Sequence, residues 1–276
     1  MASRIAQTYG LQPRGVLKFG ADEKRFRYLR RLPAPDVGVF VEHFWMIRWD
    51  LRGVAPYNAQ TVSHPSVQLG LEKGKSRIYG VVKGRSSHML GGLGEVFGVK
   101  FRPGGFYPFL KSPLSRLTNR SIALSDVFGS SAQEFEQSVL SLEFGATRAN
   151  AAENFLRQRL PQRDETAVLA GQIVDEICVN RQIMTVDDVV ARFHLGKRTL
   201  QRMFDQYVGV TPKWVIRVYR LHELVERLHQ EKAARKAVVF ADLAQELGYF
   251  DQAHFVRDFK SIIGCTPSEY LKQLRQ

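Results

Sequence analysis

Two short runs of polar and basic side chains, 55 residues apart, offer the clearest chemistry in this chain. Gln201 and Arg202 are neighbours in the first run, and Arg257 occupies the position of Arg202 in the second. An amide pairs bidentately with adenine and a guanidinium with guanine, each through two hydrogen bonds at the edge of the base. These residue types therefore indicate base reading in the major groove of double-stranded DNA.

The two runs belong to a longer internal repeat. Residues 200–204 and the Gly-Val-Thr-Pro segment 209–212 return as residues 255–259 and the Gly-Cys-Thr-Pro segment 264–267. The same spacing of a helical stretch, a glycine turn and a Thr-Pro helix start occurs twice. Two such copies in a basic chain predict two helix-turn-helix units.

Helical periodicity separates the buried from the exposed side chains of the first run. Apolar residues at i, i+3, i+4 and i+7 define a buried face, and they are Leu200, Met203, Phe204 and Tyr207. Polar residues on the remaining arc are the candidates for DNA contact. They are Lys197, Arg198, Thr199, Gln201 and Arg202.

The second run has the same pattern with different chemistry. Phe255 and Phe259 mark its buried face, and an N-cap at Asp251 would begin its helix. Ala253 and Val256 have no hydrogen-bonding side chain, so they could make only apolar contacts, for example with a thymine methyl group. The candidates for DNA contact are Gln252, Ala253, Val256, Arg257 and Lys260.

The flanking segments complete each unit. Thr185 is a suitable N-cap for the helix before the first run, because its hydroxyl can accept from an early backbone amide. Proline is tolerated in a first helical turn, so Pro212 and Pro267 predict new helices. The first of these continues as a long amphipathic helix to about residue 228.

Residues 166–276 resemble the DNA-binding domain of the AraC/XylS family of bacterial transcription regulators. The segments 242–260 and 264–270 follow the second helix-turn-helix motif of that family, whereas Gly196 departs from a usual serine. The resemblance implies seven helices, with two recognition helices joined by a long linker helix. These would enter successive major-groove segments roughly 34 Å apart. It also implies double-stranded DNA as partner, with RNA polymerase as a further one.

Residues 1–160 change to a strand-like periodicity. Val37, Val39 and Val41 alternate with other residues, as do the apolar positions of segment 67–71, which predicts half-buried strands. Regular short strands predict an antiparallel β-barrel, followed by helices up to residue 160. The chain is therefore expected to be α+β, with an all-α domain from residue 166. Segment 97–105 also resembles the cupin-like sensory domains fused to AraC-type DNA readers.

A barrel of this kind could hold a small ligand. Aromatic and polar groups predict a mostly apolar pocket with a few placed polar contacts, formed by His43, Trp45, His64 and Tyr79. The chain lacks the His-x-His pair of metal-dependent cupins, a phosphate loop and a nucleophile elbow. We therefore expect no metal, no cofactor and no enzymatic activity.

Three interpretations of the N-terminal half stay open. It could sense a small-molecule effector, or it could only hold a homodimer together. Alternatively, it is an enzyme or small-molecule-binding barrel with an accessory DNA-binding domain. Convergent catalytic or metal-binding residues would distinguish this last alternative.

Charge and cysteine usage fit a DNA-binding protein of the cytoplasm. The net charge is +13, which suits a polyanionic partner. Residues 166–276 hold 16 basic and 13 acidic residues, against 24 and 14 in residues 1–165. Bulk charge therefore does not locate the reading surface. Two cysteines, without a membrane-spanning apolar run, favour a reducing compartment and exclude a membrane protein.

Overall fold

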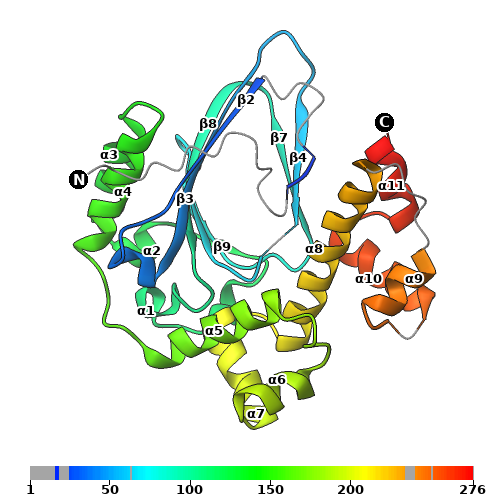
Figure 1. Cartoon of the computed structure of the whole chain (residues 1–276). Helices are drawn as coiled ribbons and strands as arrows, with labels where there is room; N and C mark the ends of the chain where they lie inside the picture. Colours follow the sequence, from blue (N-terminus) through cyan, green and yellow to red (C-terminus); the bar gives the residue numbers. More distant parts are fainter. Residues whose placement is uncertain (1–15, 19–24, 63, 234–239, 250, 276) are drawn as a thin grey trace.

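A β-rich part precedes an all-helical part in the computed structural model of the chain (Figure 1). The structure describes residues 16–18, 25–62, 64–233, 240–249 and 251–275. The predicted succession of antiparallel sheet and helical domain is confirmed. No helix among these residues is long and apolar enough to cross a membrane.

The strands form two separate antiparallel sheets. One is six-stranded and contains, in spatial order, β2 (Phe26–Arg31), β3 (Val41–Leu51), β8 (Gly92–Phe101), β5 (Gln68–Leu71), β6 (Arg77–Tyr79) and β9 (Ser121–Ile122). The other is three-stranded and contains β1 (Val16–Lys18), β4 (Tyr57–Val62) and β7 (Arg85–Leu90). Neighbouring strands pair antiparallel in both sheets.

The prediction of a closed barrel is wrong. The edge strand β2 pairs with β3 and the opposite edge strand β9 pairs with β6, so the larger sheet stays open. A closed barrel needs a continuous ladder of strands. Here β6 and β9 have only three and two residues, and within the described part of the chain the smaller sheet shares no ladder with the larger one.

One predicted strand also starts later than its pattern indicates. The segment Val37–Val39 is a 3-10 turn, in which the Phe40 amide donates to the carbonyl of Val37 over 3.0 Å. Strand β3 begins only at Val41. This local bond between residues three apart competes with strand pairing, and the alternation of three valines does not reveal it.

The larger sheet packs one face against the helices that follow it. These helices are α1 (Tyr107–Leu110), η3 (Leu114–Leu117), α2 (Ser125–Phe128), α3 (Ser131–Leu140) and α4 (Ala146–Arg157). Phe44 and Phe97 stack on the sheet with ring centroids 6.1 Å apart, and Phe135 of α3 stacks on Phe155 of α4 at 4.0 Å. Such fully buried aromatic pairs bury large apolar areas and fix the helices on the sheet.

The helical part is built around a long central helix. Its elements are α5 (Glu165–Val179), α6 (Val186–Phe193), α7 (Lys197–Met203), the π-helical turn η4 (Phe204–Val208), α8 (Pro212–Ala233), α9 (Phe240–Glu246), α10 (Gln252–Ile263) and α11 (Pro267–Arg275). Val218, Leu221 and Leu224 of α8 are fully buried between the two helix-turn-helix units. The predicted helix starts at Pro212 and Pro267 are confirmed.

Candidate nucleic-acid interface

The first unit consists of α6 and α7 with a tight turn between them. Thr185 caps α6: its hydroxyl accepts from the Asp188 amide at 3.2 Å, and the Asp188 carboxylate accepts from the Thr185 amide at 2.7 Å. This reciprocal capping box confirms the predicted cap. His194 then adopts a left-handed conformation and ends α6, and α7 starts after Gly196 without a side-chain cap.

Helix α7 separates its apolar and polar side chains as its period predicts. Leu200 and Phe204 are fully buried, and Met203 and Tyr207 are nearly so. All five candidate contact residues are exposed, namely Lys197, Arg198, Thr199, Gln201 and Arg202. Lys197 also forms an ion pair of 2.8 Å with the exposed Asp187 of α6. An exposed pair of this kind is weak, so the ammonium remains available for another anion.

The second recognition helix, α10, starts with a stronger cap. The Asp251 carboxylate accepts from the His254 amide at 2.7 Å, which confirms the predicted N-cap. Phe255 and Phe259 are fully buried. Of the candidate residues, Val256 is half-buried, and the exposed ones are Gln252, Ala253, Arg257 and Lys260.

A buried ion pair ties α10 to the linker helix. Arg217 of α8 donates to the carboxylate of Asp258 over 2.5 Å, and Asp258 is 7% exposed. Tyr249 lies beside this pair, and burial, followed by the nearby Asp258 charge, raises the pKa of Tyr249 to about 12. The phenol therefore stays neutral near the carboxylate. Sequence reasoning missed this contact, because Arg217 and Asp258 lie 41 residues apart.

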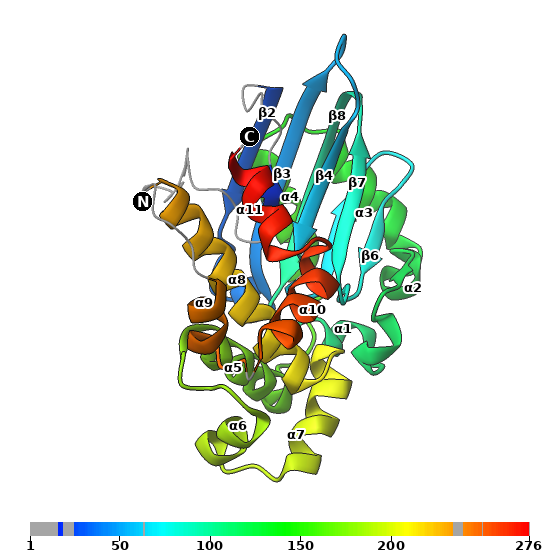
Figure 2. The ribbon, with the colours of Figure 1, turned by 90° about the vertical axis from the view of Figure 1, so that its right-hand side faces the viewer.

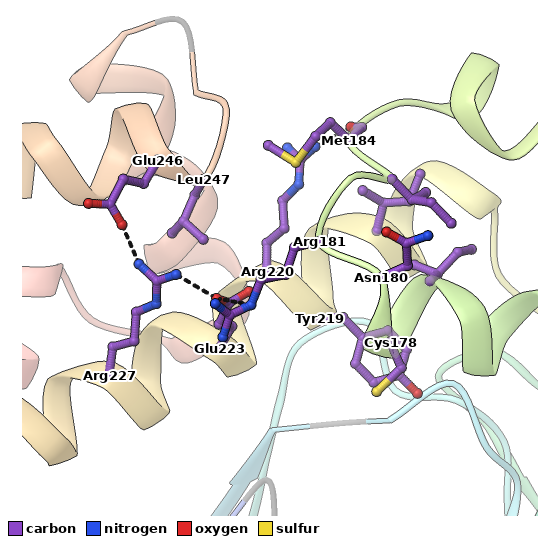
Figure 3. Close-up of a pocket in the computed structure, with 13 residues that line it drawn as sticks. Cys178, Asn180, Arg181, Met184, Tyr219, Arg220, Glu223, Arg227, Glu246 and Leu247 are labelled. Carbon is purple, nitrogen blue, oxygen red and sulfur yellow. Dashed lines mark hydrogen bonds and ion pairs between the residues drawn. The ribbon is translucent and has the colours of Figure 1, made fainter.

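A second ion-pair network holds α9 against α8 at the rim of a small cavity. Arg227 bridges Glu223 at 2.7 Å and Glu246 of α9, as Figure 3 shows. The cavity has a volume of about 60 Å³ and lies between α5, α8 and α9. Charged groups around a space of this size suit a few water molecules. The network is a further contact between α8 and the second unit, separate from the ion pair of Arg217 and Asp258.

Three of the predicted ligand residues share one face of the larger sheet. His43 pairs with Lys100, Lys100 with Gln68, and Gln68 with Tyr79, so these side chains form a row across four strands. Trp45 stands in the next row, opposite Gly98. This face is the one turned away from the helices α2 to α4.

The fourth predicted ligand residue contacts the linker helix. His64 follows β4, and its ring centroid is 4.6 Å from that of His222 and 6.3 Å from that of Tyr219, both on α8. His64 therefore belongs to the contact between the β-rich part and the helices.

Burial lowers the pKa of His43, so its imidazole is neutral at pH 7 despite the nearby Glu42.

No group of three or more His, Cys, Asp or Glu side chains could hold a metal ion among the residues that the structure describes.

Two domain families match this chain. Residues 29–123 match a domain of unknown function (DUF6597), and residues 189–273 match a helix-turn-helix domain. The second match runs from the middle of α6 into α11 and contains both recognition helices.

The curated relatives are regulators of this helix-turn-helix type. The chain is 25% identical over 175 residues to the uncharacterized HTH-type transcriptional regulator YtdP of Bacillus subtilis, which covers 59% of this chain and 22% of YtdP. It is 26% identical over 92 residues to the RCS-specific HTH-type transcriptional activator RclR of Escherichia coli, covering 33% of this chain and 31% of RclR. The chain thus spans less than a third of these relatives.

Among solved structures, that of ToxT from Vibrio cholerae aligns with 91% of this chain and 98% of its own. The identity is 13% and the TM-score 0.37, which does not establish a common fold.

Proposed function

We propose that this chain, which belongs to the AraC/XylS family through its helix-turn-helix domain, is a sequence-specific DNA-binding transcription regulator. One observation carries the proposal: α7 and α10 each bury an apolar stripe and expose a polar face within one chain. The protein is a regulator rather than an enzyme, as its helix-turn-helix relatives are.

The two exposed faces would enter successive major-groove segments of one DNA duplex. Arg202 and Gln201 on α7 suit base edges, as do Arg257 and Gln252 on α10. Lys197, Arg198, Thr199 and Lys260 suit phosphates, which take more than half of protein–DNA hydrogen bonds. Ala253 and the half-buried Val256 suit a thymine methyl group.

Footprinting of the full-length protein tests this two-segment reading. A duplex selected from a random pool should show two protected patches about one helical turn apart. The variant Arg257→Ala should lose protection mainly in one patch. The charge-matched control Arg181→Ala, which pairs with Glu223 away from both faces, should keep both. A single short patch that Arg257→Ala leaves unchanged would contradict the proposal.

The N-terminal part, residues 1–160, would regulate residues 166–276 by binding an effector or forming a homodimer. The row of His43 and Tyr79 beside Trp45 supports a small-molecule site of the cupin-like sensory kind, and we place His64 at its border with the helices. An effector changes DNA affinity only if it binds the two conformational states unequally. We propose RNA polymerase as a further partner and the cytoplasm as the location of the protein.

Linked measurements on the full chain test the sensory role. A small-molecule fraction of a cell extract should raise the melting temperature and change the DNA affinity together. Trp45→Ala should remove both effects, whereas Arg52→Ala, an exposed side chain paired with Asp50 in its own hairpin, should keep them. If no fraction shifts either quantity, sedimentation analysis should show a dimer, since dimerisation is then the role that remains.

A further inference from the structure

The two recognition helices end at glycines that the repeat makes equivalent. Gly209 follows η4 and Gly264 follows α10, with backbone φ angles of 88° and 89°. Both therefore adopt the left-handed conformation that favours glycine. Each of these two turns is contacted by the β-rich part of the chain.

At the first unit, the segment after α1 packs directly on Gly209. The Thr118 hydroxyl donates to the Gly209 carbonyl, and a Cβ atom at Gly209 would lie 2.8 Å from the carbonyl oxygen of Leu114. Backbone thus meets backbone without room for a side chain.

One turn earlier, a second contact holds the same helix end. The Gln206 amide of η4 donates to the Tyr107 hydroxyl at 2.6 Å, and the rings of Tyr107 and Tyr207 have centroids 4.4 Å apart. The end of the first recognition helix is therefore fixed by hydrogen bonds and by aromatic packing.

At the second unit, strand β7 supplies the contact. The Arg85 guanidinium lies so close to Gly264 that a Cβ atom there would be 2.8 Å from its Cζ atom. Gln60 of β4 accepts from Arg85 at 3.1 Å and orients it. A cation at this place faces the negative end of the α10 dipole. Figure 2 shows α10 just below the strands β4 and β7.

The linker helix α8 is contacted by the loop between β6 and β7. The indole of Trp214, in the first turn of α8, donates to the Lys83 carbonyl at 3.3 Å. Val62 and Val81 of the β-rich part are buried in the core of the helical part. The contacts involve the helix ends, and the polar faces of α7 and α10 remain exposed.

We infer that the N-terminal part fixes the distance and orientation between the two recognition helices, with Arg85 and Thr118 as positioning residues for the spacing of the two DNA segments. This inference rests on the proposed DNA-binding function. Each added base pair moves the second segment by about 3.4 Å and turns it by about a tenth of a turn. If α7 and α10 are held rigidly, they fit only one spacing between the two DNA segments. If the contacts of Arg85 and Thr118 are removed, the two helices fit several spacings.

The test compares full-length proteins on duplexes that differ only in spacing. The duplex selected by the wild type is prepared with zero, one and two base pairs inserted between its two protected segments. We expect the wild type to lose about tenfold in affinity or more on the two-pair insertion, and Arg85→Ala/Thr118→Val about threefold or less. The ratio to compare is the affinity for the original duplex divided by that for the two-pair insertion. Arg52→Ala also removes one positive charge, at a side chain paired with Asp50, and should keep the wild-type ratio.

The conservative variant Thr118→Ser keeps the hydroxyl donor and should also keep the wild-type ratio. If the double variant does not fold, as judged by circular dichroism, Arg85→Ala alone should still lower the ratio. A uniform loss of affinity on all three duplexes, with the ratio unchanged, overturns the inference, because the contacts would then only stabilise the fold. If the wild type selects no specific duplex, the proposed function fails instead.

Discussion

The two helix-turn-helix units have matching interiors but are anchored by different means. The first has a reciprocal capping box, formed by Thr185 and Asp188, at the start of α6. In the second, a single side-chain cap at Asp251 starts α10, and Asp258 of α10 also forms an ion pair with Arg217 of α8. A duplicated motif can therefore keep its fold while the interactions that hold it diverge.

The exposed faces differ as well. Helix α7 exposes Arg198, Gln201 and Arg202, all with hydrogen-bonding groups, whereas the first half of α10 has Ala253 and the half-buried Val256. Buried positions are constrained by packing, and exposed ones are free to change. We therefore expect the first unit to contribute more of the base discrimination and the second more of the positioning.

The largest expected effect tests the matching interiors. Phe204 and Phe259 occupy equivalent positions, and both are fully buried. Phe204→Ala and Phe259→Ala should each lower the free energy of unfolding by roughly 3–5 kcal/mol, measured by urea denaturation. Phe→Leu at either position keeps most of the volume and should cost less. A large loss at one position and none at the other would break the equivalence of the two cores.

The next effect concerns base discrimination. Arg202→Ala should weaken binding to the selected duplex by about 1–3 kcal/mol and relax the preference at one base pair, measured by titration of single-substitution duplexes. Lys260→Ala should weaken specific and random DNA alike and lower the slope of affinity against salt by about one. Equal losses on specific and random DNA for Arg202→Ala would remove its base-reading role.

A smaller effect tests the local anchoring of the first unit. Thr185→Ala removes one partner of the capping box and should cost about 1 kcal/mol in unfolding free energy. Asp251→Ala should cost a similar amount at the second unit. Thr199→Ala is the control, since that exposed side chain caps no helix and its loss should change stability by about 0.5 kcal/mol or less. Indistinguishable values for Thr185→Ala and Thr199→Ala would contradict the role of the cap.

The smallest effect concerns the ion pair beside the small cavity. Glu246→Gln removes one of the two carboxylates that Arg227 contacts, and Glu246 is exposed. Exposed pairs contribute about 0–1 kcal/mol, so thermal unfolding should change little at 0.15 M salt. The DNA contacts of α7 should be unaffected, and a loss there would show that the two units are coupled more tightly than the comparison implies.

The sequence was most informative where structure is local. Leu200 and Phe204 lie on the buried face, and Thr185 and Asp251 cap their helices, because each depends on neighbours within one or two turns. These features follow from helical period and cap chemistry alone. The ten candidate contact residues all lie on the two predicted helices, and their contact with DNA stays a prediction.

Long-range pairing was beyond the sequence. The alternation of apolar residues predicted strands, but not that β4 and β7 leave the larger sheet or that Val37 starts a turn. Likewise, the sequence does not show that His64 contacts His222 of α8. Alternation specifies which face of a strand is buried, and it does not specify the partner strand.

The corner between β7 and β8 has a mechanical consequence. Only Gly91 separates these strands, although they belong to different sheets. Strand β7 extends from this corner to Arg85 as an arm of six residues, which is about 20 Å long. A tilt of about 5° between the two sheets would therefore move the guanidinium by about 2 Å relative to Gly264. A molecule that binds between the two sheets and changes their angle would therefore shift the Arg85 contact at the end of α10.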